Sequence, residues 1–189
     1  MTDNVWTIIG EETVFEAEPF VTVKRQHLVT SAGQTVCDYY QVVLPDFVML
    51  CPMTEQRHII TLWQYKHGSR KYGLTFPAGQ IDPSESAEAA ARRELVEETG
   101  YRAGSVQFLG SCAVSGNQGC GFAHMFLVGD CIQVSEPNWG DLETMDLKLM
   151  SVADVEAAIR AGAISVLPHL ALWGLARANG FGSVYATPK

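Results

Sequence analysis

The stretch FPAGQIDPSESAEAAARRELVEETGY, residues 76–101, decides the fold, and its second half raises a question of charge. Glu94 stands three residues before Glu97 and four before Glu98, so on a helix the three side chains share one face. Carboxylates spaced in this way repel one another and destabilise a helix by roughly a few tenths of a kcal/mol per pair. Either a positive charge offsets this cost, or the face is fully solvated.

Local signals in the same stretch predict a helix. Residues 82–86 supply helix-start signals, the Ala-rich run 87–91 has high helix propensity, and Gly100 suits the C-terminal end. The preceding segment, 66–79, is rich in glycine and basic residues, which predicts a loop that runs into a short strand. The carboxylates therefore lie on a helix directly behind a glycine-rich loop.

The rest of the chain predicts strands followed by two late helices. Short apolar or alternating segments predict strands between Phe15 and Trp63, near 105–109, near 124–128 and over 144–150. Turns are expected at 31–34, 45–46 and 53–57, and a flexible loop at 111–121. Helices are expected from Ser151, which forms a capping box with Asp154, to about Gly162, and from about Pro168 to Asn179.

This order of elements indicates an α/β protein: an α/β/α sandwich with a mixed sheet and an antiparallel strand region at the N-terminus. The absence of a GxGxxG sequence argues against a doubly wound dinucleotide-binding fold. With 189 residues the chain is long enough for one sizeable core. We expect a strand region over residues 1–55 and the main domain over 56–189.

Composition argues against several functional classes. The net charge of −8 argues against a broad grip on the nucleic-acid backbone. No apolar run is long enough to span a membrane, and the first residues lack the pattern of a secretory signal. The five cysteines form no CxxC pair, which favours reduced thiols in a cytoplasmic protein.

A divalent cation would resolve the charge problem on the helix. Glu94, Glu97 and Glu98 offer hard oxygen ligands of the kind that suits Mg²⁺ or Mn²⁺ together with substrate phosphates. Gly79 would let the backbone pass close to the ions, and the carbonyl of Ala78 is a further candidate ligand. The alternative is a solvated acidic helix face with no ligand at all.

Arg93 supports the metal hypothesis, because it stands beside the carboxylates and can pair with Glu85. Such a charge-assisted contact would fix the preceding loop onto the helix. We therefore count Arg93 with the candidate catalytic residues.

The complete spacing resembles the signature of the Nudix hydrolase superfamily. The matching positions are Gly79, Glu85, Arg93-Glu94-Leu95, Glu97-Glu98 and Gly100. Tyr101 departs from it, since that family more often has an aliphatic residue there. The resemblance implies an α/β/α sandwich, with residues 56–189 as the catalytic domain. It also implies hydrolysis of a nucleoside diphosphate linked to another group, with Mg²⁺ or Mn²⁺ as cofactor.

The same resemblance implies roles for single residues. Glu94 and Glu98 would be the main metal ligands, and Glu97 would be a further ligand or the base that takes a proton from water. Family members often supply another ligand or base from a later loop, and here we choose Glu143 from the acidic segment 136–146. A solvated acidic loop is the alternative for that segment.

Two short segments narrow the resemblance to one branch. Residues 63–66, WQYK, and 76–79, FPAG, look like the ADP-ribose and nucleotide-sugar pyrophosphatases. Enzymes of that branch are typically dimers whose N-terminal strands reach the partner, so a homodimer with residues 1–55 packed on or exchanged with the partner is expected. Three departures bear on the substrate: Lys66 replaces the usual Arg, Thr75 stands where an acidic residue is common, and 111–121 lacks the branch's Pro-Gly and acidic pattern.

Three residues near the motif are candidates for substrate binding. Lys66 and Arg70 would reach the diphosphate, and Trp63 would stack on the base. The alternatives are solvated surface charges and a core aromatic residue.

The leading hypothesis is hydrolysis of ADP-ribose or a related nucleoside diphosphate sugar. A second is hydrolysis of another pyrophosphate, such as a dinucleoside polyphosphate, NADH, coenzyme A or a nucleoside triphosphate. A third is a Nudix module that senses a nucleotide without cleaving it, for which loss of the ligand glutamates would be the mark. All of these glutamates are present.

Overall fold

A computed structural model describes residues 5–139 and 144–182. The contacts divide the chain into two compact units, the first made of residues up to 46 together with 112–122 and the second of 47–111 with 123 onward. The strand over residues 47–54 belongs to the second unit, and the boundary after residue 55 stays a prediction.

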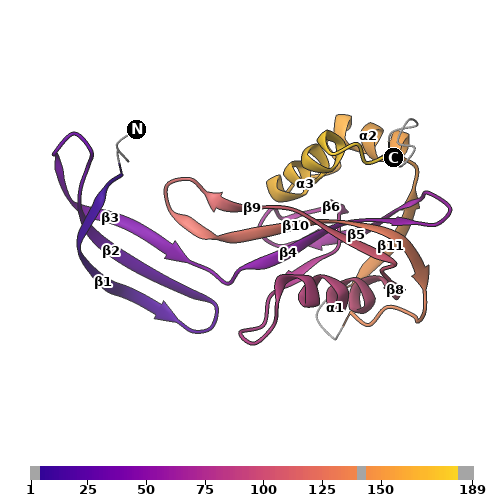
Figure 1. The fold of residues 1–189 in the computed structure, drawn as a ribbon, viewed down its shortest axis with the longest axis horizontal. Coiled ribbons are helices and arrows are strands. Elements are labelled where there is room, and N and C mark those ends of the chain that lie inside the picture. The colour runs from indigo at the N-terminus through magenta and orange to yellow at the C-terminus, as the bar shows by residue number, and fades with distance from the viewer. Residues whose placement is uncertain (1–4, 140–143, 183–189) are drawn as a thin grey trace. The chain divides into compact units, whose positions relative to one another are not determined.

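The first unit is an antiparallel meander of three strands, drawn in indigo and purple in Figure 1. Its strands are β1 (Thr7–Ala17), β2 (Val21–Val29) and β3 (Thr35–Val43). The predicted turn at 31–34 joins β2 to β3. The prediction that strands begin near Phe15 was wrong, since β1 begins eight residues earlier. Gly10 and two adjacent glutamates interrupt the alternation there, and pairing with β2, which the sequence pattern does not show, extends the strand.

The second unit contains a mixed sheet. Its strands are β4 (Phe47–Thr54), β5 (Ile59–Lys66), β6 (Lys71–Thr75), β7 (Ala78–Gln80), β8 (Tyr101–Arg102), most of β9 (Ser105–Ser115) and β10 (Gly119–Gln133), and β11 (Met145–Met150). β10 runs parallel to β4, from Ala123 opposite Phe47 to Cys131 opposite Thr54. β11 runs antiparallel to β5. The predicted mixed sheet is therefore confirmed.

The flexible loop predicted over residues 111–121 was wrong. β9 and β10 pair with each other and continue through most of this segment, leaving a turn at 116–118. Gln118 N–H donates to Ser115 Oγ at 3.1 Å and closes the turn. Small and glycine residues have little strand propensity of their own, so cross-strand hydrogen bonds rather than local preference make these strands.

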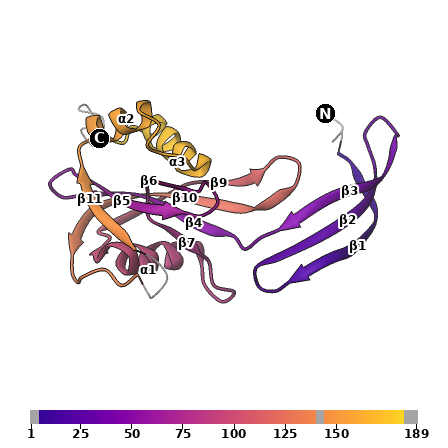
Figure 2. The same cartoon turned by 180° about the vertical axis from the view of Figure 1, so that it is seen from behind.

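Helices cover both faces of the second unit's sheet, as Figures 1 and 2 show. They are α1 (Ala87–Thr99), α2 (Val152–Arg160) and α3 (Leu167–Ala178). Alternate residues of β4 face opposite ways: Val48 and Leu50 pack in one core with α1, and Met49 and Cys51 pack in the other with α2 and α3. The predicted α/β/α sandwich is confirmed.

Local signals set the ends of the helices as predicted. Ser86 caps α1 by accepting a hydrogen bond from Ala89 N–H at 3.2 Å, and Gly100 ends it with φ 74°. Ser151 and Asp154 form the predicted capping box at the start of α2. Within the described ranges, no helix has the length and apolar character needed to cross a membrane. All five cysteines are free thiols.

Candidate metal and catalytic site

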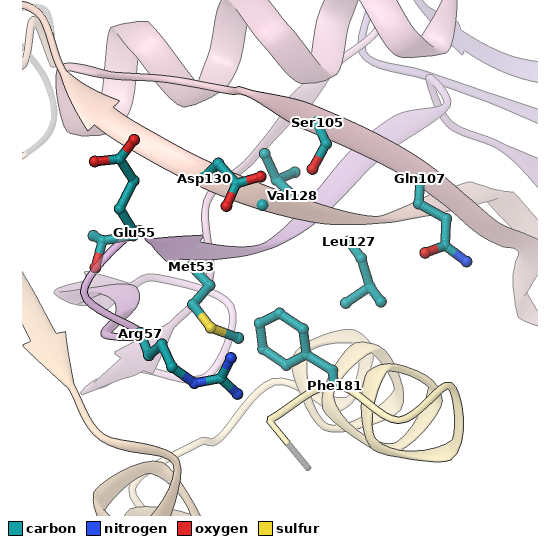
Figure 3. A pocket seen from close by; sticks show the side chains of 11 residues that line it. Met53, Glu55, Arg57, Ser105, Gln107, Leu127, Val128, Asp130 and Phe181 are labelled. Atoms are coloured by element: carbon teal, nitrogen blue, oxygen red, sulfur yellow. The ribbon is translucent and has the colours of Figure 1, made fainter. Parts of the chain in front are cut away.

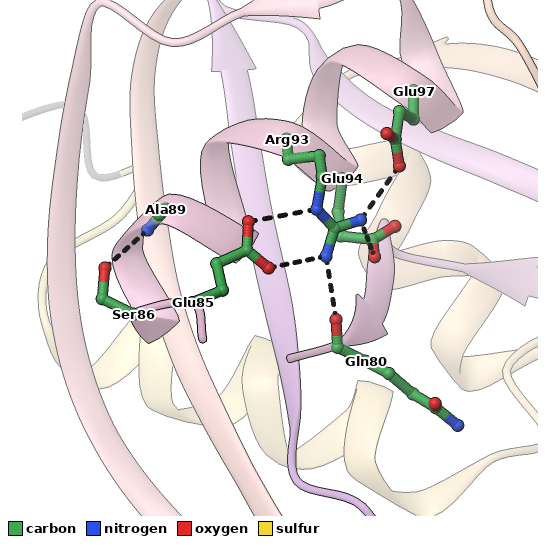
Figure 4. A network of polar contacts seen from close by, with 7 residues as sticks. All are labelled: Gln80, Glu85, Ser86, Ala89, Arg93, Glu94 and Glu97. Carbon is green, nitrogen blue, oxygen red and sulfur yellow. Dashed lines mark hydrogen bonds and ion pairs between the residues drawn. The ribbon is translucent and has the colours of Figure 1, made fainter. Parts of the chain in front are cut away.

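Arg93 is the centre of the polar network on α1 (Figure 4). Its Nε and Nη2 donate to the two carboxylate oxygens of Glu85 at 3.1 and 2.9 Å, which confirms the predicted pair. Nη2 also donates to the carbonyl of Gln80 at 3.0 Å. Nη1 donates to Glu94 at 2.6 Å and to Glu97 at 3.0 Å. One side chain thus fixes the loop before the helix and contacts two of the three clustered carboxylates.

The network carries more negative than positive charge. Glu85, Glu94 and Glu97 share the single guanidinium of Arg93. The hydrogen bond from Arg93 lowers the pKa of Glu85, and the bond to Glu85 raises the pKa of Arg93. Burial raises the pKa of Glu94, whose side chain is only 13% exposed, although Arg93 opposes this shift. A further cation would keep the buried Glu94 carboxyl ionised.

Glu98 is held from the side of β7. It is 8% exposed, and its Oε2 accepts a hydrogen bond from Ala78 N–H at 2.9 Å. At the next residue, a Cβ on Gly79 would lie 1.9 to 2.2 Å from the carboxylate atoms of Glu94. Glycine therefore lets the Glu94 carboxylate lie directly against the β7 backbone. The backbone of β7 and two of the carboxylates form one close-packed surface.

These residues fit Mg²⁺ or Mn²⁺ in chemistry and charge. Nowhere in residues 5–139 and 144–182 are three acidic, His or Cys side chains already arranged so that they could hold a metal ion. Arg93 contacts both Glu94 and Glu97, while Glu98 is bonded to Ala78 N–H. The donors are hard carboxylate oxygens, partly buried and with unbalanced negative charge, which is what these two ions require.

Comparison with known proteins identifies the family. A model of the NUDIX domain matches residues 44–170, which is more than half of the chain. The chain belongs to the Nudix family. The family predicted from residues 79–101 is confirmed, and the matched region extends far beyond that signature.

Two curated relatives and one solved structure are similar to this chain. ADP compounds hydrolase NudE of Escherichia coli (strain K12) is 39% identical over 106 residues, 54% of this chain and 55% of the relative. CMP-5'-(N-acetyl-N-hydroxy-3-aminopropyl)phosphonate hydrolase of Streptomyces rubellomurinus (strain ATCC 31215) is 26% identical over 171 residues, 86% of this chain and 82% of the relative. The match to NudE thus spans about half of that protein.

The solved structure is titled a crystal structure of an ADP compounds hydrolase. It superposes with a TM-score of 0.80 at 25% identity and covers 95% of this chain and 97% of its own. The resemblance to the ADP-ribose and nucleotide-sugar branch of Nudix proteins is confirmed as a resemblance.

The predicted substrate residues all lie on the β5–β6 hairpin, and one of them faces away from the Nudix helix. Trp63 pairs across the strands with Leu74, which packs in the core of α2 and α3. Ile60, which packs against α1, points to the opposite face of β5. The structure therefore does not bring Trp63 to the carboxylates of α1, and its stacking on the base of a substrate stays a prediction. Lys66, at the end of β5, and Arg70, in the turn with φ 53°, stay predictions for substrate binding.

The predicted roles of Glu143 and Ala78 in the site both stay predictions. Glu143 lies outside the described residues, so its assignment as a base stays a prediction. Ala78 was predicted to present its carbonyl to a metal, and the contact found in the structure is made by its N–H with Glu98. The predicted ligand set of Ala78, Glu94, Glu97 and Glu98 stays a prediction as a whole.

No pattern in the sequence predicts the contacts at the C-terminal end of the Nudix helix. Asn138 N–H donates to the carbonyl of Glu97 at 2.7 Å, and Trp139 Nε1 donates to the carbonyl of Glu98 at 2.6 Å. In the segment 136–146, the sequence predicts a role only for the acidic residues. Nothing in its local pattern places it on a helix 41 residues earlier.

A hollow of about 270 Å³ lies elsewhere in the Nudix domain (Figure 3). It is lined by Met53, Thr54, Glu55, Arg57, Ser105, Gln107, Leu127, Val128, Gly129, Asp130 and Phe181. Met53, Leu127 and Phe181 belong to the core under α2 and α3. Among the residues that the structure describes, none of those predicted for catalysis, metal binding or substrate binding lines it, and it is separate from the carboxylates of α1.

His169 of α3 has a structural role. It is 5% exposed, and its Nδ1 accepts a hydrogen bond from Phe76 N–H at 3.2 Å, just before the residues of β7. Burial, with a smaller contribution from the charge of Lys66, lowers the pKa of His169 to about 4. The side chain is therefore neutral near pH 7 and acts as a hydrogen-bond acceptor.

This buried histidine predicts a pH dependence of stability. The unfolded chain binds a proton at the ordinary value of 6.5, and the folded protein only near 4, so the unfolded state holds more protons between these values. The free energy of unfolding should fall by about 2 kcal/mol between pH 7 and pH 5 through this group. Urea unfolding at the two pH values measures it. In His169→Gln, which can still accept the bond from Phe76, this part of the fall should disappear; an undiminished fall would contradict the prediction.

Proposed function

We propose that this protein hydrolyses the pyrophosphate bond of ADP-ribose or a related nucleoside diphosphate sugar, with Mg²⁺ or Mn²⁺ as cofactor. The products are a nucleoside monophosphate and a sugar phosphate. The observation that carries the proposal is the acidic network on the Nudix helix, in which three carboxylates share one guanidinium and a fourth, Glu98, is buried beside it. Binding of a small anionic substrate to a surface of this charge needs a mediating cation.

The chain's own residues divide the work in this proposal. Glu94 and Glu98 hold the cation, and Arg93 keeps Glu85 and the loop before α1 in place. A bound Mg²⁺ or Mn²⁺ supplies positive charge that neutralises the diphosphate oxygens. The oxygen of a water molecule bonds to one phosphorus as the bridging P–O bond breaks, and a carboxylate takes the water's proton.

Glu97 is the described residue best placed to take that proton. Its side chain is 48% exposed, far more than that of Glu94, so it can meet a water molecule from solvent. Its contact with Arg93 Nη1 at 3.0 Å holds it beside the ligands. Glu143 is the competing proposal for the same role.

The relatives support the substrate class, and they leave open which nucleobase the substrate carries. By their names, one relative is a hydrolase of ADP compounds and the other is a hydrolase of a CMP-linked phosphonate. Both names describe hydrolysis of a nucleotide compound. We propose the same class here, with the adenine compound as the first candidate.

A substrate panel tests the proposal. ADP-ribose, ADP-glucose, GDP-mannose, CDP-linked compounds, NADH and diadenosine polyphosphates are incubated with Mg²⁺ or Mn²⁺, and nucleoside monophosphate is measured with and without chelator. Chelator-sensitive cleavage of a nucleotide sugar is the expected result. Binding of a panel member without cleavage of any would instead favour the sensing module.

The contact between Gly79 and Glu94 gives a direct test of the metal ligand. In Gly79→Ala the new Cβ would overlap the Glu94 carboxylate and push it from its place. Affinity for Mn²⁺, measured by calorimetry, should fall roughly tenfold. Gly68→Ala is the matched control, because nothing lies within 4 Å of its Cβ. Equal affinities in the two variants would remove Glu94 from the proposed ligand set.

We also propose that the protein is a homodimer joined through its first unit. The β1–β3 meander leaves many large hydrophobic side chains exposed: Val5, Trp6, Ile8, Ile9, Val14, Phe15, Phe20, Tyr40, Val43 and Leu44. Apolar surface concentrated in this way is typical of an interface. Sedimentation velocity should give about twice the chain mass of 20.7 kDa, and a monomer at micromolar concentration would contradict the proposal.

A further inference from the structure

Two of the proposed metal ligands, Glu97 and Glu98, lie in the last turn of α1, where backbone carbonyls have no partner within the helix. Two of these carbonyls belong to the carboxylate residues themselves. Asn138 N–H donates to the carbonyl of Glu97 at 2.7 Å, and the indole N–H of Trp139 donates to the carbonyl of Glu98 at 2.6 Å. A segment distant in sequence thus completes the hydrogen bonding of this turn.

The same segment is fixed closely against the end of the helix. The N–H groups of Val134 and Ser135 donate to the carbonyl of Gly100 at 2.9 and 3.2 Å. A Cβ on Gly100 would lie 2.2 Å from the carbonyl oxygen of Ser135, so only glycine allows this approach. Residues 134–139 therefore form a clamp on the last turn of α1.

Glu98 is held at both of its ends. Ala78 N–H bonds to its carboxylate at 2.9 Å, and Trp139 Nε1 bonds to its main-chain oxygen. The first contact comes from β7 and the second from the clamp. A shift of the last turn would move the carboxylate away from Glu94 and from β7, because side-chain position follows the backbone.

We propose that Trp139 is a positioning residue that fixes the backbone of Glu98 and so sets the place of its carboxylate for the divalent cation. This inference rests on the proposed metal-dependent function. Trp139 acts through its side chain, while Asn138 acts through its main-chain N–H, and this difference allows the two contacts to be removed separately.

The test measures Mn²⁺ binding alone, by the electron paramagnetic resonance signal of free Mn²⁺, in protein without nucleotide. Trp139→Phe keeps an aromatic ring and removes the N–H donor, and it should weaken Mn²⁺ binding roughly tenfold, as loss of outer contacts to metal ligands commonly does. Hydrogen exchange of the amides at residues 98–100 should be faster in the same variant, because the last turn loses its fixed partner.

Substitutions at Asn138 supply the control and a second variant. Asn138→Ala keeps the main-chain N–H and should bind Mn²⁺ as the wild type does. Asn138→Pro removes that N–H and should weaken binding in the same direction as Trp139→Phe. If Trp139→Phe does not fold, Trp139→Leu takes its place, because it also removes the indole donor to the Glu98 carbonyl.

The outcomes separate the inference from the function on which it rests. Wild-type Mn²⁺ affinity in Trp139→Phe would overturn the positioning role of Trp139, even if this variant melts at a lower temperature in chelator or if Asn138→Pro binds Mn²⁺ more weakly. A wild-type protein that binds no Mn²⁺ would instead overturn the proposed metal site itself. Weaker binding in the two variants, with an unchanged Asn138→Ala, supports the inference.

Discussion

Glu98→Gln should lower kcat by orders of magnitude, roughly 10³-fold, without unfolding the protein. The substitution removes one negative charge from the proposed metal site while it keeps the size of the side chain. The amide oxygen of Gln can still accept the hydrogen bond from Ala78 N–H, so the link between α1 and β7 remains. Steady-state cleavage of the best nucleotide from the panel, at saturating Mg²⁺, gives kcat, and thermal melting followed by circular dichroism reports on the fold.

Glu88→Gln is the matched control for this prediction. Glu88 lies on the same helix, and its substitution by Gln is the same chemical change. Its side chain is exposed and pairs with Arg92 at 2.8 Å. An exposed pair of this kind contributes little to stability, and it lies outside the carboxylate network. The control should retain wild-type turnover. If Glu98→Gln were as active as Glu88→Gln, the assignment of Glu98 as a ligand would be wrong.

The helix that carries the site was predictable because its signals are local. Ser86 and Gly100 define its ends through contacts with residues three or four positions away. Such cap contacts depend only on the local sequence, so the same residues form them in other helices. The pair of Glu85 and Arg93 was also predictable, since it joins the loop to the helix that directly follows it. In these cases the residues that interact are close in the sequence.

The strands were less predictable, because pairing decides them. β1 and the β9–β10 hairpin contain glycine and small polar residues that would not form strands alone. Their partners supply the hydrogen bonds, and neither the partner nor the register is visible in a local pattern. The same limit applies to Trp63. The alternation of residues along β5 is visible in the sequence, but the sequence does not show which of the two faces of β5 is covered by α1.

The clamp on the end of α1 shows the same limit within the site. Trp139 contacts a residue 41 positions earlier through its side chain, and no motif or period marks it. Ala78 gives a milder case. Its place beside the carboxylates was predicted from the glycine next to it, but the group that it presents to Glu98, an N–H, follows from how β7 packs on α1. The spacing of the residues on α1 therefore predicts which carboxylates lie close together. The packing of β7 and of the clamp on α1 decides which contacts hold them.

Arg93→Lys should reduce both stability and activity. Arg93 binds Glu85 through two nitrogens and reaches the Gln80 carbonyl, Glu94 and Glu97 with the same planar group. A lysine ammonium carries its donors on one nitrogen and cannot span these acceptors. The side chains of Arg93, Glu85 and Glu94 are only 30%, 16% and 13% exposed, so acceptors left unpaired are costly. We expect the free energy of unfolding to fall by about 2 kcal/mol and kcat/KM to fall roughly 100-fold.

Arg92→Lys separates this effect from a general loss of guanidinium on the helix. Arg92 is the neighbouring residue, and it pairs with Glu88 at the exposed surface of the helix. Its replacement should change the free energy of unfolding by less than about 0.5 kcal/mol and leave kcat/KM unchanged. Urea unfolding and initial rates on the two variants supply the comparison. Equal losses of stability and kcat/KM in both variants would mean that the network around Arg93 has no special role. Losses confined to Arg93→Lys would mean that the planar guanidinium of Arg93 holds the carboxylates in their places.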